Sequence, residues 1–204
     1  MFAMPSVHVK RANLDHPIND LLADRFSPYA YDPRLVEPAK LRSCLEAARW
    51  AASSFNEQPW SFLVAERGDE AGFAKMLACL VQANQAWARQ AGVLMITIAA
   101  KTFTRNGKPN RVAQHDVGLA VANLTVQAVA LGLGVHEMAG IDLDATRQAY
   151  AIPDGHDPVT ALALGYAADP GSDPGHGDRD RTPRSREPLS QFVFAGSWNQ
   201  PAPL

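Results

Sequence analysis

Two serine hydroxyls and one asparagine amide stand close together in the stretch AASSFNEQPW. Ser53 and Ser54 follow an apolar helical pattern and Asn56 precedes an apolar strand pattern, so the three side chains lie at a junction between elements. A rigid row of hydrogen-bonding groups at such a junction can hold a polar ligand. The same residues also suit a plain helix exit and turn, with Asn56 and Pro59 as breakers and Trp60 entering a core.

Two arginine-bearing segments near opposite ends of the chain have side chains that suit a phosphate group. Arg25 and Ser27 lie two residues apart after a short helical pattern, and Arg184 and Arg186 repeat that spacing. Arginine donates paired hydrogen bonds to phosphate oxygens, and a serine hydroxyl adds a neutral donor. Together these groups could bind one phosphate, whereas each arginine pair taken alone is more typical of a solvated surface.

Length and composition indicate one globular domain over residues 1–204. The 204 residues are 47% hydrophobic and 20% charged, which is ordinary for a chain that buries one sizeable core. A formal net charge of -2 argues against a nucleic-acid surface, so any anion site must be local. Cys44 and Cys79 lack metal-motif spacing and are expected to be buried. Because no signal peptide or membrane-spanning run is evident, we expect a cytoplasmic protein.

Hydrophobic periodicity predicts a mixed order of helices and strands. Continuous apolar runs in the strands indicate that both faces of the sheet are covered. A segment rich in Pro, Gly, Asp and Arg, residues 169–186, is expected to be an exposed and flexible arm. The predicted helices are 16–25, a helix from Pro38 that leads to Ser53, 69–81, 111–133 and 144–150; the predicted strands are 60–65, 92–100 and 159–167; the predicted loops include 101–110 and 136–140.

The helix predicted at 111–133 is apolar on almost every face from Val117 to Leu131. A helix with this pattern must be buried on all sides, either at the centre of a protein or in a subunit interface. Because a chain of this size has little core to surround it, a dimer is expected. Gly132 and Gly134 are expected to end the helix.

These separated segments resemble the FMN-dependent nitroreductase family. SSFNEQPW is similar to the SSxNxQPW signature of that family, and Arg25-x-Ser27 and Arg184-x-Arg186 match its opening and closing phosphate motifs. The segment VHEMAG, residues 135–140, resembles the family's loop after the long helix. The resemblance covers about residues 16 to 194 and implies an α+β fold, with a central β-sheet flanked by helices, in an intertwined homodimer that binds FMN at its interface.

The resemblance also implies a role for each matching residue. Arg25, Ser27, Arg184 and Arg186 would bind FMN phosphate and ribityl groups. Ser53, Ser54 and Asn56 would reach the ribityl hydroxyls and ring edge of the FMN held by the other subunit. Main-chain groups of Met138, Ala139 and Gly140 would face flavin N5, and Asn84 could add a ring contact.

Two positions depart from the family's pattern. Tyr29 stands where the family usually has a third basic residue, which affects one flavin contact and the charge near the ring. Ala52 replaces the proline that usually precedes the serine pair. Both departures concern residues next to the expected cofactor.

The function implied by the resemblance is a ping-pong oxidoreductase. NADH or NADPH would reduce the flavin and leave, and an electron-poor acceptor such as a nitroaromatic, quinone or enone would then be reduced at the same face. The cofactor does the chemistry, so no side-chain acid or base is needed. Loop 101–110, with Phe103, is expected to shape the acceptor pocket.

Two other functions stay open at this point. Tyr29 in place of a basic residue is compatible with an FMN-binding protein for storage or sensing that has no reductase turnover. The apolar face from Val117 to Leu131 is compatible with a helical interaction module that binds no flavin. The colour of the purified protein, and its bleaching by NADH or NADPH, would separate the three.

Other catalytic motifs find no support in the sequence. No Gly-x-Gly-x-x-Gly follows a predicted strand, and His136-Glu137 lacks the second histidine of a zinc-protease helix. His115 and Asp116 are adjacent on a predicted helix, so their side chains should point apart rather than form a hydrolytic pair.

Overall fold

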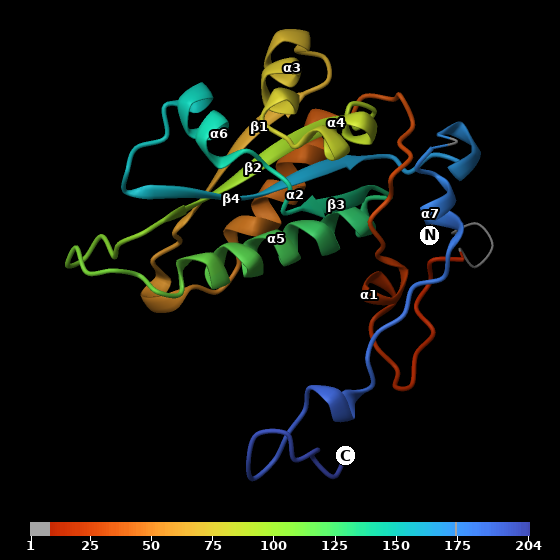
Figure 1. The fold of residues 1–204 in the computed structure, drawn as a ribbon, viewed down its shortest axis with the longest axis vertical. Coiled ribbons are helices and arrows are strands. Elements are labelled where there is room, and N and C mark those ends of the chain that lie inside the picture. Colours follow the sequence, from red (N-terminus) through yellow and green to blue (C-terminus); the bar gives the residue numbers. More distant parts are fainter. Residues whose placement is uncertain (1–8, 174) are drawn as a thin grey trace.

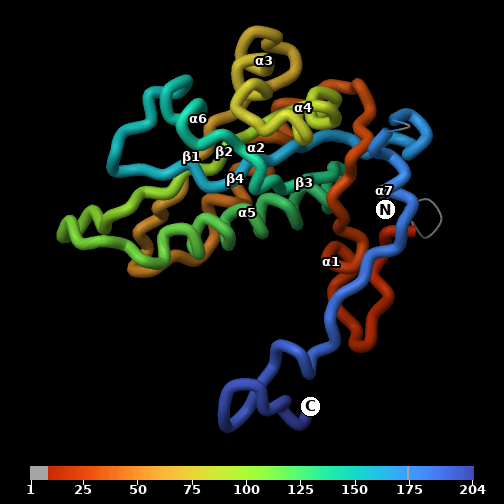
Figure 2. Tube along the Cα trace, viewed as in Figure 1, coloured from red at the N-terminus to blue at the C-terminus, as the bar shows by residue number. Residues whose placement is uncertain are grey.

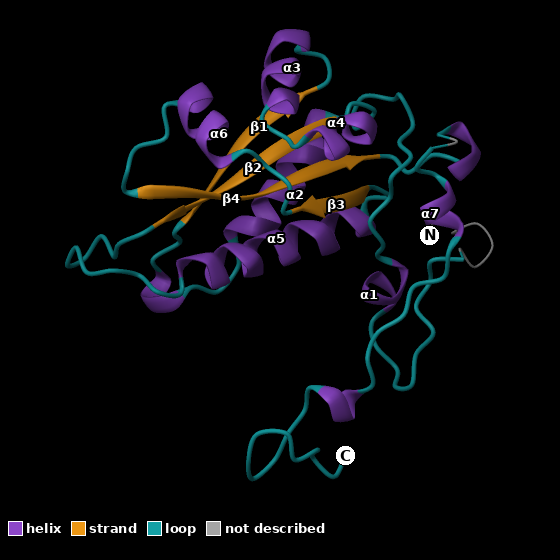
Figure 3. Ribbon diagram, in the orientation of Figure 1, coloured by secondary structure: helices purple, strands orange, loops and turns teal. Residues whose placement is uncertain are grey.

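The computed structural model describes residues 9–173 and 175–204, which form an antiparallel β-sheet with helices on both faces (Figure 1 and Figure 3). Neighbouring strands pair in the order β1-β2-β4-β3. The strands of this sheet are β1 (Trp60–Glu66), β2 (Val93–Ala100), β3 (Gly134–Met138) and β4 (His156–Gly165). The expected α+β class and the central sheet are therefore confirmed.

Helices cover both faces of the sheet. In chain order, the described α-helices are α1 (Asp20–Asp24), α2 (Pro38–Arg49), α3 (Glu70–Ala78), α4 (Gln82–Ala88), α5 (Ala113–Ala130), α6 (Leu143–Tyr150) and α7 (Asp178–Arg181). Three short 3-10 turns are described as well: η1 (Ser54–Asn56), η2 (Pro170–Ser172) and η3 (Leu189–Gln191). Helices α2 and α5 lie against one face, and α3, α4 and α6 lie against the other (Figure 1).

Strand β2 has the two-sided burial that its continuous apolar run predicts. Successive side chains of a strand point to opposite faces. Val93 and Met95 accordingly pack with α2 and α5, whereas Leu94 and Ile96 pack with α3 and α4. The predicted burial of the cysteines is also confirmed, and burial raises the pKa of the Cys44 thiol to about 11.

Helix α5 ends at a glycine, as predicted, but the segment after it is not a loop. Gly132 has φ +75°, and the N–H groups of Gly132 and Leu133 donate to the carbonyls of Val129 and Ala128, which closes the helix end. Residues 134–138 then form edge strand β3, which pairs with β4. The prediction that 136–140 is entirely loop was wrong because a strand this short carries too few residues to establish a period of two.

Helix α5 is not buried on every side of the described chain. Val117, Ala120 and Leu124 pack in the core, but Leu119 on another face of the helix is 37% exposed. A single chain therefore leaves one face of the helix uncovered. Burial of the remaining face by a partner stays a prediction.

The N-terminal and C-terminal segments lie together beside the sheet domain. Helix α1 is shorter than the predicted 16–25 because Asn19 caps it by accepting a hydrogen bond from the Leu21 N–H. In the segment 169–186, Asp173 and Asp180 are buried, which corrects the expectation that the whole arm is exposed. Its flexibility stays a prediction. Beyond it the chain runs away from the body and carries η3 (Figure 2).

No described helix combines the length and the hydropathy needed to cross a bilayer.

Candidate functional site

The serine and asparagine motif lies in a strained turn between α2 and β1. Phe55, Asn56 and Gln58 all have positive φ, a backbone conformation that residues other than glycine rarely adopt. Two hydrogen bonds fix the turn. The Gln58 N–H donates to Ser53 Oγ at 3.0 Å, and the Ser54 N–H donates to Oδ2 of Asp116 at 3.0 Å. The turn is thus anchored to the N-terminal part of α5.

Asp116 has a structural role that sequence reasoning missed. Its side chain is 2% exposed and binds the Ser54 backbone, whereas His115 is exposed. The predicted absence of a His115–Asp116 pair is consistent with this burial, because the two neighbours lie on different faces of the helix.

Three arginines converge near β3, although their sequence positions are far apart. Burial lowers the pKa of Arg25, and the nearby charge of Arg186 lowers it further, whereas Glu137 raises it. Burial likewise lowers the pKa of Arg184, and the charges of Arg25 and Arg186 add to that effect. Repulsion among these guanidinium groups means that an anion bound between them would remove an existing electrostatic cost.

Arg25 and Arg186 have free hydrogen-bonding capacity. Arg25 Nη1 contacts Ser27 Oγ at 3.3 Å, and Arg186 Nη1 donates to the carbonyl of Ser185 at 2.7 Å. A guanidinium has five N–H donors, so most of the donors on both side chains are unused within the described chain. The structure therefore brings together Arg25, Ser27 and Arg186 in a donor set that fits a phosphate.

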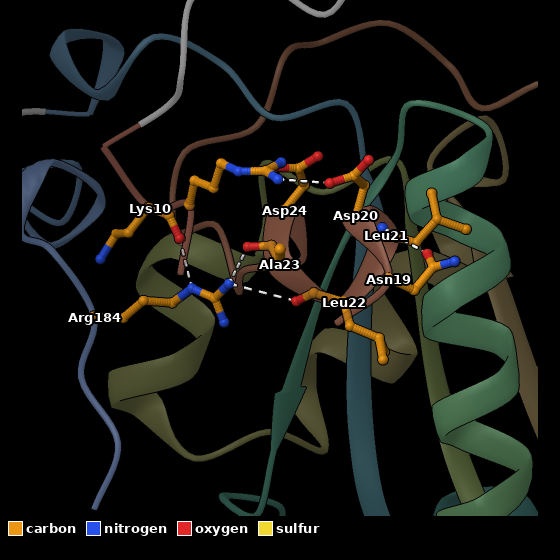
Figure 4. Close-up of polar contacts among 9 residues, drawn as sticks. Lys10, Asn19, Asp20, Leu21, Leu22, Ala23, Asp24 and Arg184 are labelled. Carbon is orange, nitrogen blue, oxygen red and sulfur yellow. Dashed lines mark hydrogen bonds and ion pairs between the residues drawn. The ribbon is translucent and has the colours of Figure 1, made fainter. Parts of the chain in front are cut away.

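Arg184 differs from Arg186 because its donors are already engaged (Figure 4). Arg184 Nε donates to the Lys10 carbonyl at 2.5 Å, and Nη2 donates to the carbonyls of Ala23 and Leu22. The last two carbonyls belong to α1, whose C-terminal carbonyls lack partners within the helix. Arg184 thus joins the arm to α1 and is chiefly a structural residue in this chain.

Tyr29 contacts a cation that sequence reasoning missed. Arg179 of α7 donates from Nη1 to the Tyr29 hydroxyl at 2.8 Å, and its Cζ lies 4.9 Å from the centre of the Tyr29 ring. The ring also packs edge-on against Trp87 and His136, at centroid distances of 5.0 and 4.6 Å. A basic group therefore stands beside Tyr29, although it comes from another part of the chain. Arg179 lies in a polar run of the sequence in which no motif indicates a contact with Tyr29.

The end of β3 offers two backbone donors. Within the described chain, the N–H groups of Ala139 and Gly140 donate to no acceptor. Gly140 is closely enclosed, because a Cβ at this position would lie 2.5 Å from Asn84 Nδ2. Asn84 Nδ2 donates to the Gly140 carbonyl at 3.1 Å, so Asn84 supports this turn. Met138 is 4% exposed, and its side chain belongs to the core.

The serine motif and the arginine cluster lie at opposite ends of α5 (Figure 1). Ser54 is bonded to Asp116 near the start of the helix, whereas Pro28 packs on Gly134 beyond its end. At 1.5 Å per residue, the helix between these points spans roughly 20 Å. One chain therefore holds the predicted cofactor residues in two separate groups: Arg25, Ser27, Tyr29, Met138, Ala139, Gly140, Arg184 and Arg186 in one, and Ser53, Ser54 and Asn56 in the other.

Among the described residues, no group of three or more His, Cys, Asp and Glu side chains could hold a metal ion.

Comparison with known proteins shows where this architecture recurs. The chain is 30% identical to a solved oxidoreductase containing FMN, with a TM-score of 0.87 over 97% of this chain and 100% of that one. A nitroreductase family protein from Clostridium difficile is 25% identical, with a TM-score of 0.68 over 87% of this chain and 96% of that one. The major NAD(P)H-flavin oxidoreductase of Aliivibrio fischeri is 26% identical over 195 residues, which cover 75% of this chain and 88% of that protein.

The profile of the Nitroreductase family matches residues 22–166, a span that contains the strained serine turn, the whole sheet and the end of β3. The arginines at 184 and 186 lie beyond this span, but they are near enough to Arg25 within it for the charges of Arg25 and Arg186 to lower the pKa of Arg184. The fold, the matched span and the order of the motifs agree, and the chain belongs to the Nitroreductase family.

Proposed function

We propose that the protein is an FMN-dependent NAD(P)H oxidoreductase that reduces an electron-poor acceptor, such as a nitroaromatic, a quinone or an enone, by a ping-pong mechanism. Its family and its likeness to an NAD(P)H-flavin oxidoreductase support a general flavin oxidoreductase role. When bound, FMN would accept two electrons from NADH or NADPH and pass them to the acceptor.

The observation that carries this proposal is the arginine cluster near β3 together with the unpaired backbone donors that follow this strand. Arg186 lies close enough to Arg25 for its charge to lower the Arg25 pKa, and the Ser27 hydroxyl contacts Arg25. These groups would bind the FMN phosphate by charge-assisted hydrogen bonds. The free N–H groups of Ala139 and Gly140 would hold the polar edge of the ring at N5, where electron density changes on reduction.

A second copy of the chain would complete each site. Ser53, Ser54 and Asn56 cannot reach the arginine cluster of their own chain, because α5 separates the two groups. A homodimer packed along the exposed face of α5 would place the serine turn of one copy beside the arginines of the other. This arrangement supports two FMN sites per dimer.

Absorption spectroscopy of the purified protein tests the function directly. We expect a flavin spectrum that bleaches when NADH or NADPH is added without oxygen and recovers when a nitroaromatic or a quinone is added. Colourless protein that takes up no FMN would overturn the proposal. The same titration with both reductants would reveal which nicotinamide the protein prefers.

A second candidate is an FMN-binding protein without turnover, used for storage or sensing. It is favoured by Tyr29, which stands where the family usually has a basic residue, although Arg179 brings a basic group to the Tyr29 hydroxyl. Protein that is yellow but does not bleach with either reductant would support this candidate over the enzyme.

A further inference from the structure

The loop after β2 is strongly cationic. Residues 101–111 read KTFTRNGKPNR, with Lys or Arg at 101, 105, 108 and 111 and with no Asp or Glu. The whole chain has a formal net charge of -2, so this density of positive charge is local. A cationic segment of this kind raises the local concentration of anions.

The loop is attached to the strained serine turn. The Thr104 N–H donates to Glu57 Oε1 at 2.7 Å, and the Ala100 N–H donates to the Pro59 carbonyl at 2.8 Å. Within the loop, the Phe103 N–H donates to the Lys108 carbonyl at 2.9 Å. The loop is therefore positioned beside the residues that would face the flavin of a partner copy.

One arginine of the loop is stacked but unpaired. Arg105 Cζ lies 3.7 Å from the centre of the Phe55 ring and 5.5 Å from that of Phe103, and the two rings meet edge-on at 5.8 Å. In the described chain, Arg105 makes no hydrogen bond or ion pair. A guanidinium held by its face keeps its N–H edge available for a carboxylate and loses little freedom on binding.

Phe55 combines an exposed side chain with a strained backbone conformation. It has φ +56°, and its side chain is 69% exposed rather than packed in a core. Bulky residues with positive φ are rare and often mark functional positions. The strained turn thus presents an aromatic ring between the flavin candidates Ser54 and Asn56.

We propose that Phe55, Phe103 and Arg105 recognise a planar aromatic acceptor that carries a carboxylate. The rings would contact the flat part of the acceptor, and the Arg105 edge would pair with its carboxylate. The inference rests on the proposed function, because it assigns the acceptor of that reaction. A phosphate group of NADPH is the competing ligand for the Arg105 edge, and the response of the KM for NADPH to Arg105→Gln distinguishes it from an acceptor carboxylate.

Ligand binding to the FMN-loaded protein tests the site apart from turnover. Benzoate is the probe and benzamide its neutral counterpart, and both are titrated while the loop amide signals are followed by NMR. We expect Arg105→Gln to weaken benzoate binding about tenfold and to leave benzamide binding unchanged. Lys108→Gln is the control, since Lys108 is an exposed cation of the same loop with no side-chain contact described.

Kinetics with 4-nitrobenzoate and 4-nitrobenzamide give the second readout. Arg105→Gln should raise the KM for 4-nitrobenzoate about tenfold, with unchanged values for 4-nitrobenzamide and for NADH and NADPH. Equal changes with both acceptors, equal effects of Lys108→Gln, or a raised KM for NADPH alone would overturn the assignment. If no acceptor is reduced, the proposed function fails, and a benzoate affinity that depends on Arg105 still supports an aromatic carboxylate site.

Discussion

Asp180 accepts a hydrogen bond from the backbone N–H of Tyr29 at 2.8 Å, across 151 positions of sequence. The same oxygen, Oδ2, accepts from the Ala30 N–H at 3.1 Å, and the side chain is 2% exposed. Tyr29 ends the segment that begins at Arg25, and Asp180 precedes the segment that reaches Arg186. One buried carboxylate therefore joins the two halves of the arginine cluster.

Replacing Asp180 should weaken both the fold and the cofactor site. Asp180→Ala would leave the buried Ala30 N–H and the partly buried Tyr29 N–H without this acceptor, at a cost of about 1–3 kcal/mol in unfolding free energy. The released arm should also lower FMN occupancy. Chemical denaturation and the flavin-to-protein absorbance ratio measure the two effects. Asp180→Asn keeps an acceptor oxygen and should restore part of both.

A neighbouring acidic residue is the control for this prediction. Asp178 lies on the same helix but is exposed, and its carboxylate pairs with Arg181 on the surface. Asp178→Ala should change stability and flavin content little, because exposed ion pairs contribute little. Similar losses in Asp178→Ala and Asp180→Ala would contradict the role given to Asp180.

The two arginines of the closing motif should behave differently. Arg186→Gln removes a side chain with unused donors and should weaken FMN binding by about 10-fold or more without changing the Tm. Arg184→Gln removes hydrogen bonds to the carbonyls of Lys10 and Ala23 and should lower the Tm as well. Flavin titration and thermal unfolding separate the two variants.

The double variant Arg25→Gln with Arg186→Gln should lose most bound flavin, because it removes two of the converging charges. Arg181→Gln, which alters an exposed cation of the same arm, should keep it. Full flavin occupancy in the double variant would exclude this cluster as the phosphate site.

A charge on the exposed face of α5 should separate the proposed dimer. Leu119→Lys places an ammonium group on that face, where Leu119 is 37% exposed and its replacement disturbs little of the core of one chain. We expect a monomer in analytical ultracentrifugation and reduced FMN binding. Leu143→Lys is the control because Leu143 is 52% exposed on α6, on the other side of the sheet. An unchanged mass for Leu119→Lys would place the dimer contact elsewhere.

Acid should destabilise the fold partly through His136. Burial lowers its pKa, and the charges of Arg179 and Arg25 lower it further, despite the hydrogen bond to the Pro28 carbonyl. Below the ordinary histidine pKa of about 6.5, the unfolded chain binds more protons than the folded one, so stability is present above that pH and falls as pH decreases. The slope from this residue cannot exceed about 1.4 kcal/mol per pH unit.

Urea unfolding between pH 5.5 and 7.5 measures this dependence. His136→Gln should flatten the loss of stability toward low pH, whereas His115→Gln, at an exposed position, should leave it unchanged. A slope that is the same in His136→Gln and the parent protein would show that other groups cause the acid sensitivity.

The sequence by itself determined which elements form and which side chains could meet a flavin. The continuous apolar run of β2 indicated a strand covered on both faces, and Gly132 indicated the end of α5. The serine turn and the arginine pairs were found by residue type and spacing. Such features are local, because periodicity, helix ends and turn chemistry depend on neighbours in the chain.

Only the tertiary structure decided how these groups are used. Arg184 and Arg186 look equivalent in sequence, but Arg184 donates to the carbonyls of residues 10 and 22–23, whereas Arg186 donates to the carbonyl of its neighbour Ser185. The partnership of Asp180 with Tyr29 and the separation of the serine turn from the arginines along α5 are equally invisible in the sequence. These relations depend on contacts between distant segments, and spacing along a chain carries no information about which segments the packing of the core brings together.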